Sequence, residues 1–135
     1  MKRMTIRLKE YDWVIRMYWE SESEDAEEIV GEMLRMGCPP EWADKAWENI
    51  ASGRLNQGVT FSSYARRKSV MVVGRGESAR QEFNSLLHEM RHVNAHIGEA
   101  DGLPPDGEAV CYLQGKLAEG VWWMVKGLVM RSGGA

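Results

Sequence analysis

The chain has 135 residues, of which 44% are hydrophobic and 27% are charged, and this composition is typical of one globular domain. The net charge of −3 gives no support for a nucleic acid or an anionic membrane as the partner. No signal peptide is evident, residues 121–130 are too short to cross a bilayer, and Cys38 and Cys111 stand in unrelated contexts. We therefore expect a cytoplasmic protein with free thiols.

Two runs near the N-terminus alternate between apolar and polar residues, as strands do when one face is covered. The first run contains Met4, Ile6 and Leu8, and the second spans residues 13–19. Only Glu10, Tyr11 and Asp12 fall between them. This spacing predicts a hairpin.

Two helices are expected next, because apolar residues recur at helical spacing. The first helix follows a serine cap, ends near Gly37 and carries the stripe Ala26, Ile29, Val30, Met33 and Leu34. The second opens at Pro39-Pro40 and carries Ala43, Ala46, Trp47 and Ile50 on one side.

A loop from Gly53 to Gly58 leads into a second predicted hairpin, formed by residues 59–64 and 69–73. Its turn holds the only basic cluster, Arg66-Arg67-Lys68, which we interpret as a solvated turn. The run Ser-Val-Met-Val-Val has no polar alternation, and this predicts an inner strand covered on both faces. The other strand has polar residues at Thr60, Ser62 and Tyr64, which we expect to face outward at a free sheet edge.

Two long helices complete the pattern, from about residue 77 to 97, with Gly98 as the stop, and from about 106 to 130. The first has a core stripe of Ala79, Phe83, Leu86, Met90, Val93 and Ile97. The order ββααββαα predicts the α+β class, with a small mixed or antiparallel sheet packed against helices. We expect a single domain over residues 1–135 with a disordered tail at 132–135.

The first of these long helices carries an HExxH pattern, formed by His88, Glu89 and His92. Residues four apart on a helix lie about 40° apart around the axis, so both imidazoles can reach one zinc ion. Glu89 is then placed to take a proton from a metal-bound water molecule. The histidines also face away from the core stripe. A chance match of two surface histidines is the alternative.

A zinc site needs a third protein ligand. His96 lies about 12 Å along the helix axis from His88, too far to share the ion. Glu99 and Asp101 could fold back, but nothing local holds them. Glu108 is the better candidate, because it begins a helix that can return alongside the first. Gly115 on the same face would permit a close approach of the two helices, although Glu108 could instead complement the dipole of its own helix.

The HExxH pattern, followed by Gly107-Glu108-Ala109 at the head of an apolar helix, resembles a minimal gluzincin metallopeptidase of the small bacterial and phage type. The resemblance covers roughly residues 59–125. It implies a zincin-like core, zinc ligands at His88, His92 and Glu108, and Glu89 as the general base.

The chain departs from that family where an aspartate four residues after the ligand glutamate orients one histidine. Tyr112 stands at this position here. Tyr112, Arg91 and His96 are candidates for stabilising the transition state or for supporting the ligands.

The resemblance implies a zinc-dependent metallopeptidase that cuts a peptide or protein substrate lying along the edge strand at residues 59–64. An alternative is a zinc-stabilised binding or regulatory module with lost or incidental activity, in which Trp13, Trp19, Trp42 and Trp47 could supply a partner surface. In a small domain such tryptophans are more often core residues. A metal-free protein with a fortuitous HExxH is the third reading. The sequence does not indicate an oligomeric state.

Overall fold

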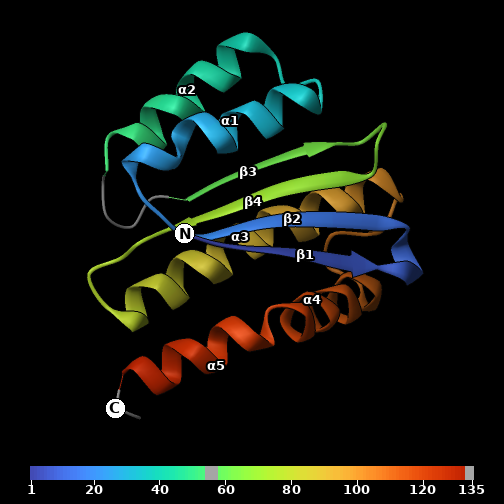
Figure 1. Cartoon of the computed structure of the whole chain (residues 1–135). Coiled ribbons are helices and arrows are strands. Elements are labelled where there is room, and N and C mark those ends of the chain that lie inside the picture. Colours follow the sequence, from blue (N-terminus) through green and yellow to red (C-terminus); the bar gives the residue numbers. More distant parts are fainter. Residues whose placement is uncertain (54–57, 133–135) are drawn as a thin grey trace.

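The computed structural model describes residues 1–53 and 58–132, and in this part of the chain a four-stranded mixed sheet packs against five α-helices. The fold therefore belongs to the α+β class, as the sequence predicted. The strands run in the order β1 (Lys2–Leu8), β2 (Trp13–Ser21), β4 (Lys68–Gly74) and β3 (Gly58–Ser63). Figure 1 shows the helices on both sides of the sheet: α1 (Ala26–Arg35), α2 (Pro40–Ala51), α3 (Ala79–Ala100), α4 (Glu108–Gly120) and α5 (Trp122–Arg131). Short 3-10 turns, η1 (Lys9–Tyr11) and η2 (Ser23–Asp25), precede β2 and α1.

Both predicted hairpins are confirmed, because β1 pairs antiparallel with β2 and β3 pairs antiparallel with β4. The hairpins join through β2 and β4, which run parallel with Val14 opposite Lys68. This contact makes the sheet mixed and places β4 inside it, as its unbroken apolar run predicted. Strand β3 lies at one edge.

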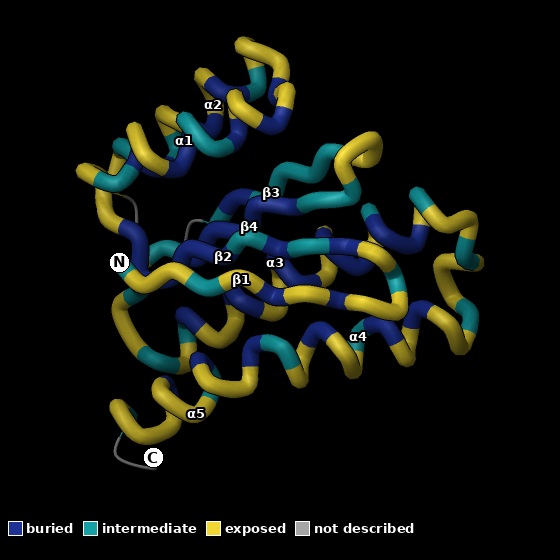
Figure 2. Tube along the Cα trace, turned by 45° about the vertical axis from the view of Figure 1, so that its right-hand side comes forward, coloured by how far each residue is buried: buried dark blue, intermediate teal, exposed yellow. Residues whose placement is uncertain are grey.

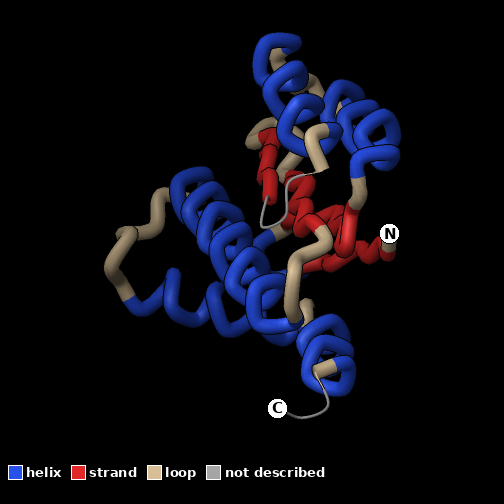
Figure 3. Tube along the Cα trace, turned by 90° about the vertical axis from the view of Figure 1, so that its left-hand side faces the viewer, coloured by secondary structure: helices blue, strands red, loops and turns tan. Residues whose placement is uncertain are grey.

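The sheet has a hydrophobic core on each face, which is why helices lie on both sides of it (Figure 3). On one face, α1 and α2 cover residues that include Tyr18, Val70 and Val72. On the other face, the larger core joins alternate residues of β1, β2 and β4 to α3, α4 and α5. The outer sides of the helices are exposed (Figure 2).

Two predicted helix boundaries are wrong. Helix α3 continues through Gly98 to Ala100, and the left-handed glycine that follows it is Gly102, with φ +67°. Gly98 serves packing instead, since a Cβ there would lie 3.4 Å from Val110 Cγ1 on α4. The predicted last helix is two helices, divided at Val121. Gly120 packs so closely on β1 that a Cβ would lie 2.7 Å from Ile6 Cγ2.

The predicted core is largely confirmed, with three exceptions, of which Leu34 on α1 is the most exposed at 48%. Phe83 and Trp47 are 40% and 43% exposed, whereas the rest of the α3 stripe from Leu86 to Ile97 is buried. Trp13 and Trp19 are core residues and Trp42 is half-buried. Residues 54–57 of the predicted loop, and 133–135 of the predicted tail, lie outside the described residues. None of the described helices is long and apolar enough to cross a membrane.

Candidate active site

The two histidines of the HExxH pattern converge on one point. His88 and His92 lie one turn apart on the exposed side of α3, and their Nε2 atoms are 3.3 Å apart. The rings are set edge to face, with centroids 5.0 Å apart and planes at 70°. This spacing is long for a hydrogen bond between two imidazoles, but it suits two nitrogens that bind the same ion.

Glu89, between these histidines in sequence, is turned into the protein and is only 5% exposed. Its Oε1 accepts a hydrogen bond of 2.8 Å from the Thr60 hydroxyl. Its Oε2 lies 3.9 Å from His88 Nε2. Burial raises the pKa of this carboxyl above its ordinary value, and the Thr60 hydrogen bond and the charges of the two histidines partly oppose that rise. A carboxylate with a raised pKa next to convergent imidazoles has the properties of a general base.

Gly58 is needed where β3 approaches this carboxylate. A Cβ at this position would lie 2.6 Å from Glu89 Oε2 and 2.8 Å from its Cδ. Real Cβ atoms do not come so close to a neighbour, so any larger residue would displace the glutamate. The glycine at the start of β3 thus leaves the space that Glu89 occupies.

Thr60 and Ser62 of β3, and Tyr64 directly after the strand, bond to helix α3, and the prediction that they face outward is wrong. Thr60 bonds to Glu89, Ser62 to His96, and the Tyr64 hydroxyl donates to Glu99 Oε2 at 3.2 Å. The predicted alternation along the strand is confirmed, because Val59 packs in the core on the other face of the sheet. The covering helix presents a polar surface here, because this is the side of α3 that carries the HExxH pattern.

A cleft of about 340 Å³ opens beside these residues, between α2 and α3 and across β3. His92 and His96 line one wall, Thr60 lines the floor, and Trp42 and Lys45 on α2 line the other wall. Trp42 also packs against Phe61, with ring centroids 5.4 Å apart. The second predicted helix, which the family resemblance did not account for, therefore forms part of the site.

The structure does not bring Glu108 together with the histidines, and its predicted place in the ligand set finds no support among the described residues. The residue is exposed in the first turn of α4. Because α3 continues to Ala100 before the chain reverses, this turn lies beside the end of α3. Asn94 fixes the register by donating to Val110 O and to Gln114 Oε1, both at 2.9 Å. Glu108 lies beyond Asn94 on the side away from His88, in the solvent-facing part of its helix.

The face of α4 that was expected to approach α3 is also the wrong one. Nothing lies within 4 Å of a Cβ placed at Gly115, and Tyr112 is 70% exposed. Helix α4 packs inward through Val110, Leu113 and Leu117 instead. Within the described ranges, no group of three or more His, Cys, Asp or Glu side chains could hold a metal ion. Glu99 and Asp101 are engaged elsewhere, with Tyr64 and Arg67.

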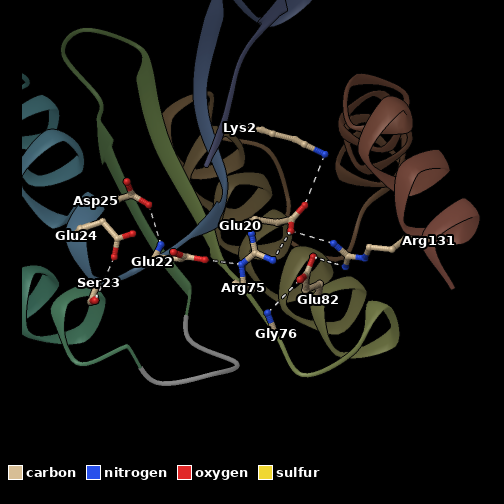
Figure 4. Close-up of polar contacts among 10 residues, drawn as sticks. All are labelled: Lys2, Glu20, Glu22, Ser23, Glu24, Asp25, Arg75, Gly76, Glu82 and Arg131. Atoms are coloured by element: carbon tan, nitrogen blue, oxygen red, sulfur yellow. Dashed lines mark hydrogen bonds and ion pairs between the residues drawn. The ribbon is translucent and has the colours of Figure 1, made fainter.

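A second buried polar cluster lies at the other end of α3, and no sequence pattern predicts it (Figure 4). Glu82 is 1% exposed; its Oε1 accepts from Gly76 N, and its Oε2 lies 2.9 Å from Arg131 on α5. Arg131 also contacts Glu20 at 2.9 Å, and Arg75 and Lys2 approach Glu20 at 3.5 and 3.7 Å. Glu20 has φ +57° at an irregularity of β2, which turns its side chain into the cluster.

The residues missed at the candidate site are the partners of the pattern and not the pattern itself. No role in the site was predicted for Gly58 or Ser69. For Ser69 a signal existed, because a single buried serine in an otherwise apolar strand indicates a specific hydrogen bond. Thr60 and Ser62 were noticed but placed on the wrong side of the strand.

The comparisons with known proteins add no assignment: no family model matches the chain, and neither a curated protein nor a solved structure matches it.

Proposed function

We propose that the protein is a zinc-dependent hydrolase that cuts a peptide bond in the cleft between α2 and α3. The observation that carries the proposal is the convergence of His88 and His92 beside a buried carboxylate, with Nε2 atoms 3.3 Å apart. The gluzincin-type resemblance of the HExxH pattern supports the same chemistry. Because the cleft is lined by the edge strand, an extended peptide or protein segment fits it as substrate.

The two histidines fit zinc in type and spacing. Zinc–nitrogen bonds of about 2.0–2.1 Å at a tetrahedral angle place two nitrogens about 3.3–3.4 Å apart. The separation of the two Nε2 atoms matches this value. Zinc held here would supply Lewis-acid chemistry, because it polarises a carbonyl and lowers the pKa of water.

The protein's own contribution to hydrolysis is the handling of one proton. Glu89 Oε2 faces the histidines, while Oε1 is held by Thr60. Oε2 accepts the proton of the attacking water, and the same carboxyl group delivers it to the leaving amine nitrogen. The hydrogen bond to Thr60 fixes the orientation of the carboxylate so that the correct oxygen faces the reaction.

The incomplete ligand set favours a second function of another class. Since the described residues contain no third ligand with the two histidines, the protein could be a zinc-stabilised binding module whose hydrolytic activity is lost or incidental. Exposed apolar residues on α5, including Trp122, Trp123 and Met130, would then offer a contact surface.

The test combines metal analysis with hydrolysis of a peptide library. We expect about one zinc per chain in the wild-type protein, and loss of zinc in His88→Ala and His92→Ala. Glu89→Gln should keep zinc but lower hydrolysis by at least about 10²-fold, since a general base contributes 10²–10⁴-fold. Zinc binding without any hydrolysis would favour the binding module, and no zinc after repletion would refute both functions.

Two control variants sharpen this test. Glu108→Ala should leave the zinc content unchanged, because the register of α4 holds Glu108 away from the histidines. If Glu108→Ala loses zinc, the three-ligand set of the gluzincins is restored. If Glu89→Gln itself loses zinc, Glu89 is a ligand and not the base.

A further inference from the structure

Four side chains form a hydrogen-bonded row that leads from the core of the sheet to the candidate cleft. Trp13 Nε1 donates to Ser69 Oγ at 2.9 Å, Ser69 Oγ lies 2.7 Å from Ser62 Oγ, and Ser62 Oγ lies 2.7 Å from His96 Nδ1. Trp13 and Ser69 are buried, whereas His96 is half-buried and lines the cleft beside His92. The row is separate from the HExxH pattern and from its hydrogen bond to Thr60.

The direction of hydrogen-bond donation along the row follows from the group at its buried end, Trp13. An indole nitrogen only donates, so Ser69 accepts from Trp13 and has its own proton to place. Among the described residues, Ser62 is the acceptor within reach of that fully buried hydroxyl. If Ser62 passes its proton on to His96 Nδ1, all three donors of the row have an acceptor, which buried polar groups require.

The reverse direction leaves one hydroxyl without an acceptor in the row. If His96 Nδ1 carried the proton, either Ser69 or Ser62 would lose its acceptor, and a buried hydroxyl without an acceptor destabilises the fold. The distance from Ser62 Oγ to His96 Nδ1 is 2.7 Å, which is typical of a hydroxyl donor and short for an N–H donor. Both arguments place the imidazole proton on the other nitrogen, Nε2.

We infer that His96 is held as the tautomer with its proton on Nε2, and that this N–H donates a hydrogen bond to the carbonyl oxygen of the peptide bond that is cut. This role rests on the proposed function. Negative charge grows on that oxygen during hydrolysis, so a donor fixed before the reaction stabilises the transition state more than the bound substrate. The ring of His96 lies 6.4 Å from the ring of His92, which suits a group that contacts the substrate beside the metal ligands.

The surroundings of His96 also favour its neutral form. Burial is the main cause that lowers its pKa, the charge of His92 acts in the same direction, and Glu99 opposes both. A neutral imidazole with Nδ1 engaged has a single proton to donate, at Nε2. The two other residues considered from the sequence for this role, Arg91 and Tyr112, are exposed and do not line the cleft.

The first test reads the tautomer directly, with no need for zinc or substrate. Nitrogen-15 NMR of the metal-free protein should show His96 protonated at Nε2 and unprotonated at Nδ1. In Ser62→Ala this tautomer should lose its dominance, whereas Ser63→Ala, in the adjacent residue, should leave it unchanged because Ser63 bonds to the turn at Arg66. A proton on Nδ1 in the wild-type protein, or an unchanged tautomer in Ser62→Ala, would overturn the inference.

The second test measures the catalytic role. His96→Ala should lower kcat by about 10²–10³-fold with little change in KM and full zinc content, as loss of one oxyanion donor does. His96→Gln should recover part of kcat, because its amide N–H can reach the place of imidazole Nε2. Hydrolysis that is unaffected in His96→Ala would overturn the inference and leave the proposed function standing. A wild-type protein that hydrolyses no peptide would instead overturn the proposed function, and the catalytic use of His96 with it.

Discussion

Helix α3 carries two buried glutamates, Glu82 and Glu89, which lie two turns apart and have opposite surroundings. Glu82 is 1% exposed and is held by the Arg131 guanidinium and by the backbone N–H of Gly76. Glu89 is 5% exposed, and in the described part of the chain its partners are a single hydroxyl and the flanking histidines, with no lysine or arginine in an ion pair. The same residue type on the same helix is thus neutralised at one end and left uncompensated at the other.

The difference separates a stabilising carboxylate from a reactive one. A buried charge with a cationic partner is held in one state and links elements, here β2, α3 and α5 (Figure 4). A buried carboxylate without such a partner lowers the stability of the fold and keeps a raised pKa, which is typical of a site where a proton is exchanged. Five substitutions test this comparison.

The largest effect on stability is expected when the partnered glutamate loses its cation. Arg131→Ala leaves Glu82 buried without the one side-chain partner it has among the described residues, so the free energy of unfolding should fall by about 2–3 kcal/mol. The value lies below that for a fully buried pair because the Arg131 side chain is 41% exposed. Chemical denaturation measures it, with Lys126→Ala on the same helix as the neutral control. Equal stability of the two variants would mean that the cluster holds nothing together.

Displacement of the uncompensated glutamate should affect activity more than stability. A Cβ in Gly58→Ala would meet Glu89 Oε2 at 2.6 Å and push the carboxylate aside. A shift of about 1 Å in a reacting group costs on the order of 10²-fold in rate, and the strain should lower the free energy of unfolding by about 1–3 kcal/mol. Peptide hydrolysis and denaturation are measured together. Gly115→Ala, where nothing lies within 4 Å, is the control and should retain full activity; an equally active Gly58→Ala would contradict the tight fit.

Removal of the charge should affect the two glutamates in opposite directions. Because the folded state raises the pKa of Glu89, ionisation of this group weakens the fold once the pH rises above the unfolded value near 4.5. Glu89→Gln should therefore gain about 0.5–2 kcal/mol of unfolding free energy at pH 7 and nothing at pH 4. Glu82→Gln should lose stability at pH 7. Denaturation in the presence of a chelator measures both variants, and a destabilised Glu89→Gln would remove the distinction between the two carboxylates.

The smallest effect is expected at a partnered carboxylate in the other helical layer. The hydrogen bond from Lys68 lowers the pKa of Glu32, with a further contribution from Arg35 against the opposing effect of burial. Its stabilisation is fully present above pH 4.5 and is lost as the pH falls through the lowered pKa. Glu32→Gln should cost about 0.5 kcal/mol at neutral pH and nothing in strong acid. Denaturation at a series of pH values measures this, with Glu27→Gln at an exposed position as the control. A cost of Glu32→Gln that grows as the pH falls would contradict the predicted pH dependence.

Local patterns predicted the elements of this fold well, because they depend on neighbours in the sequence. The alternation in 4–9 and 13–19 predicted the first hairpin, and the apolar run at 69–73 predicted an inner strand. The parallel contact between β2 and β4 could not be read in this way, since it joins residues that are far apart in the chain. No local sequence pattern indicates which strand of the first hairpin pairs with which strand of the second.

Only the part of the candidate site that lies within a single helix could be predicted from the sequence. Residues four apart lie on the same side of a helix, so His88 and His92 come together once α3 forms. Their Nε2 atoms are 3.3 Å apart in the structure. The place of Glu108 depended instead on where α3 ends, and the three further residues to Ala100 moved the next helix to another register. The direction of Thr60 and Ser62 depended on which face of β3 the polar side of α3 would cover.

The parallel pairing of β2 with β4 also determines how the chain must fold. Each hairpin can form from neighbouring residues within microseconds. Alignment of Val14 with Lys68 instead requires closure of the long chain segment that contains α1, α2 and β3. The conformational entropy of this segment is lost before the contacts between β2 and β4 can compensate for it. The joining of the two hairpins is therefore expected to limit the folding rate. The amides between β2 and β4 should accordingly be the last to exchange their hydrogens with solvent, because they open only when the two halves of the sheet separate.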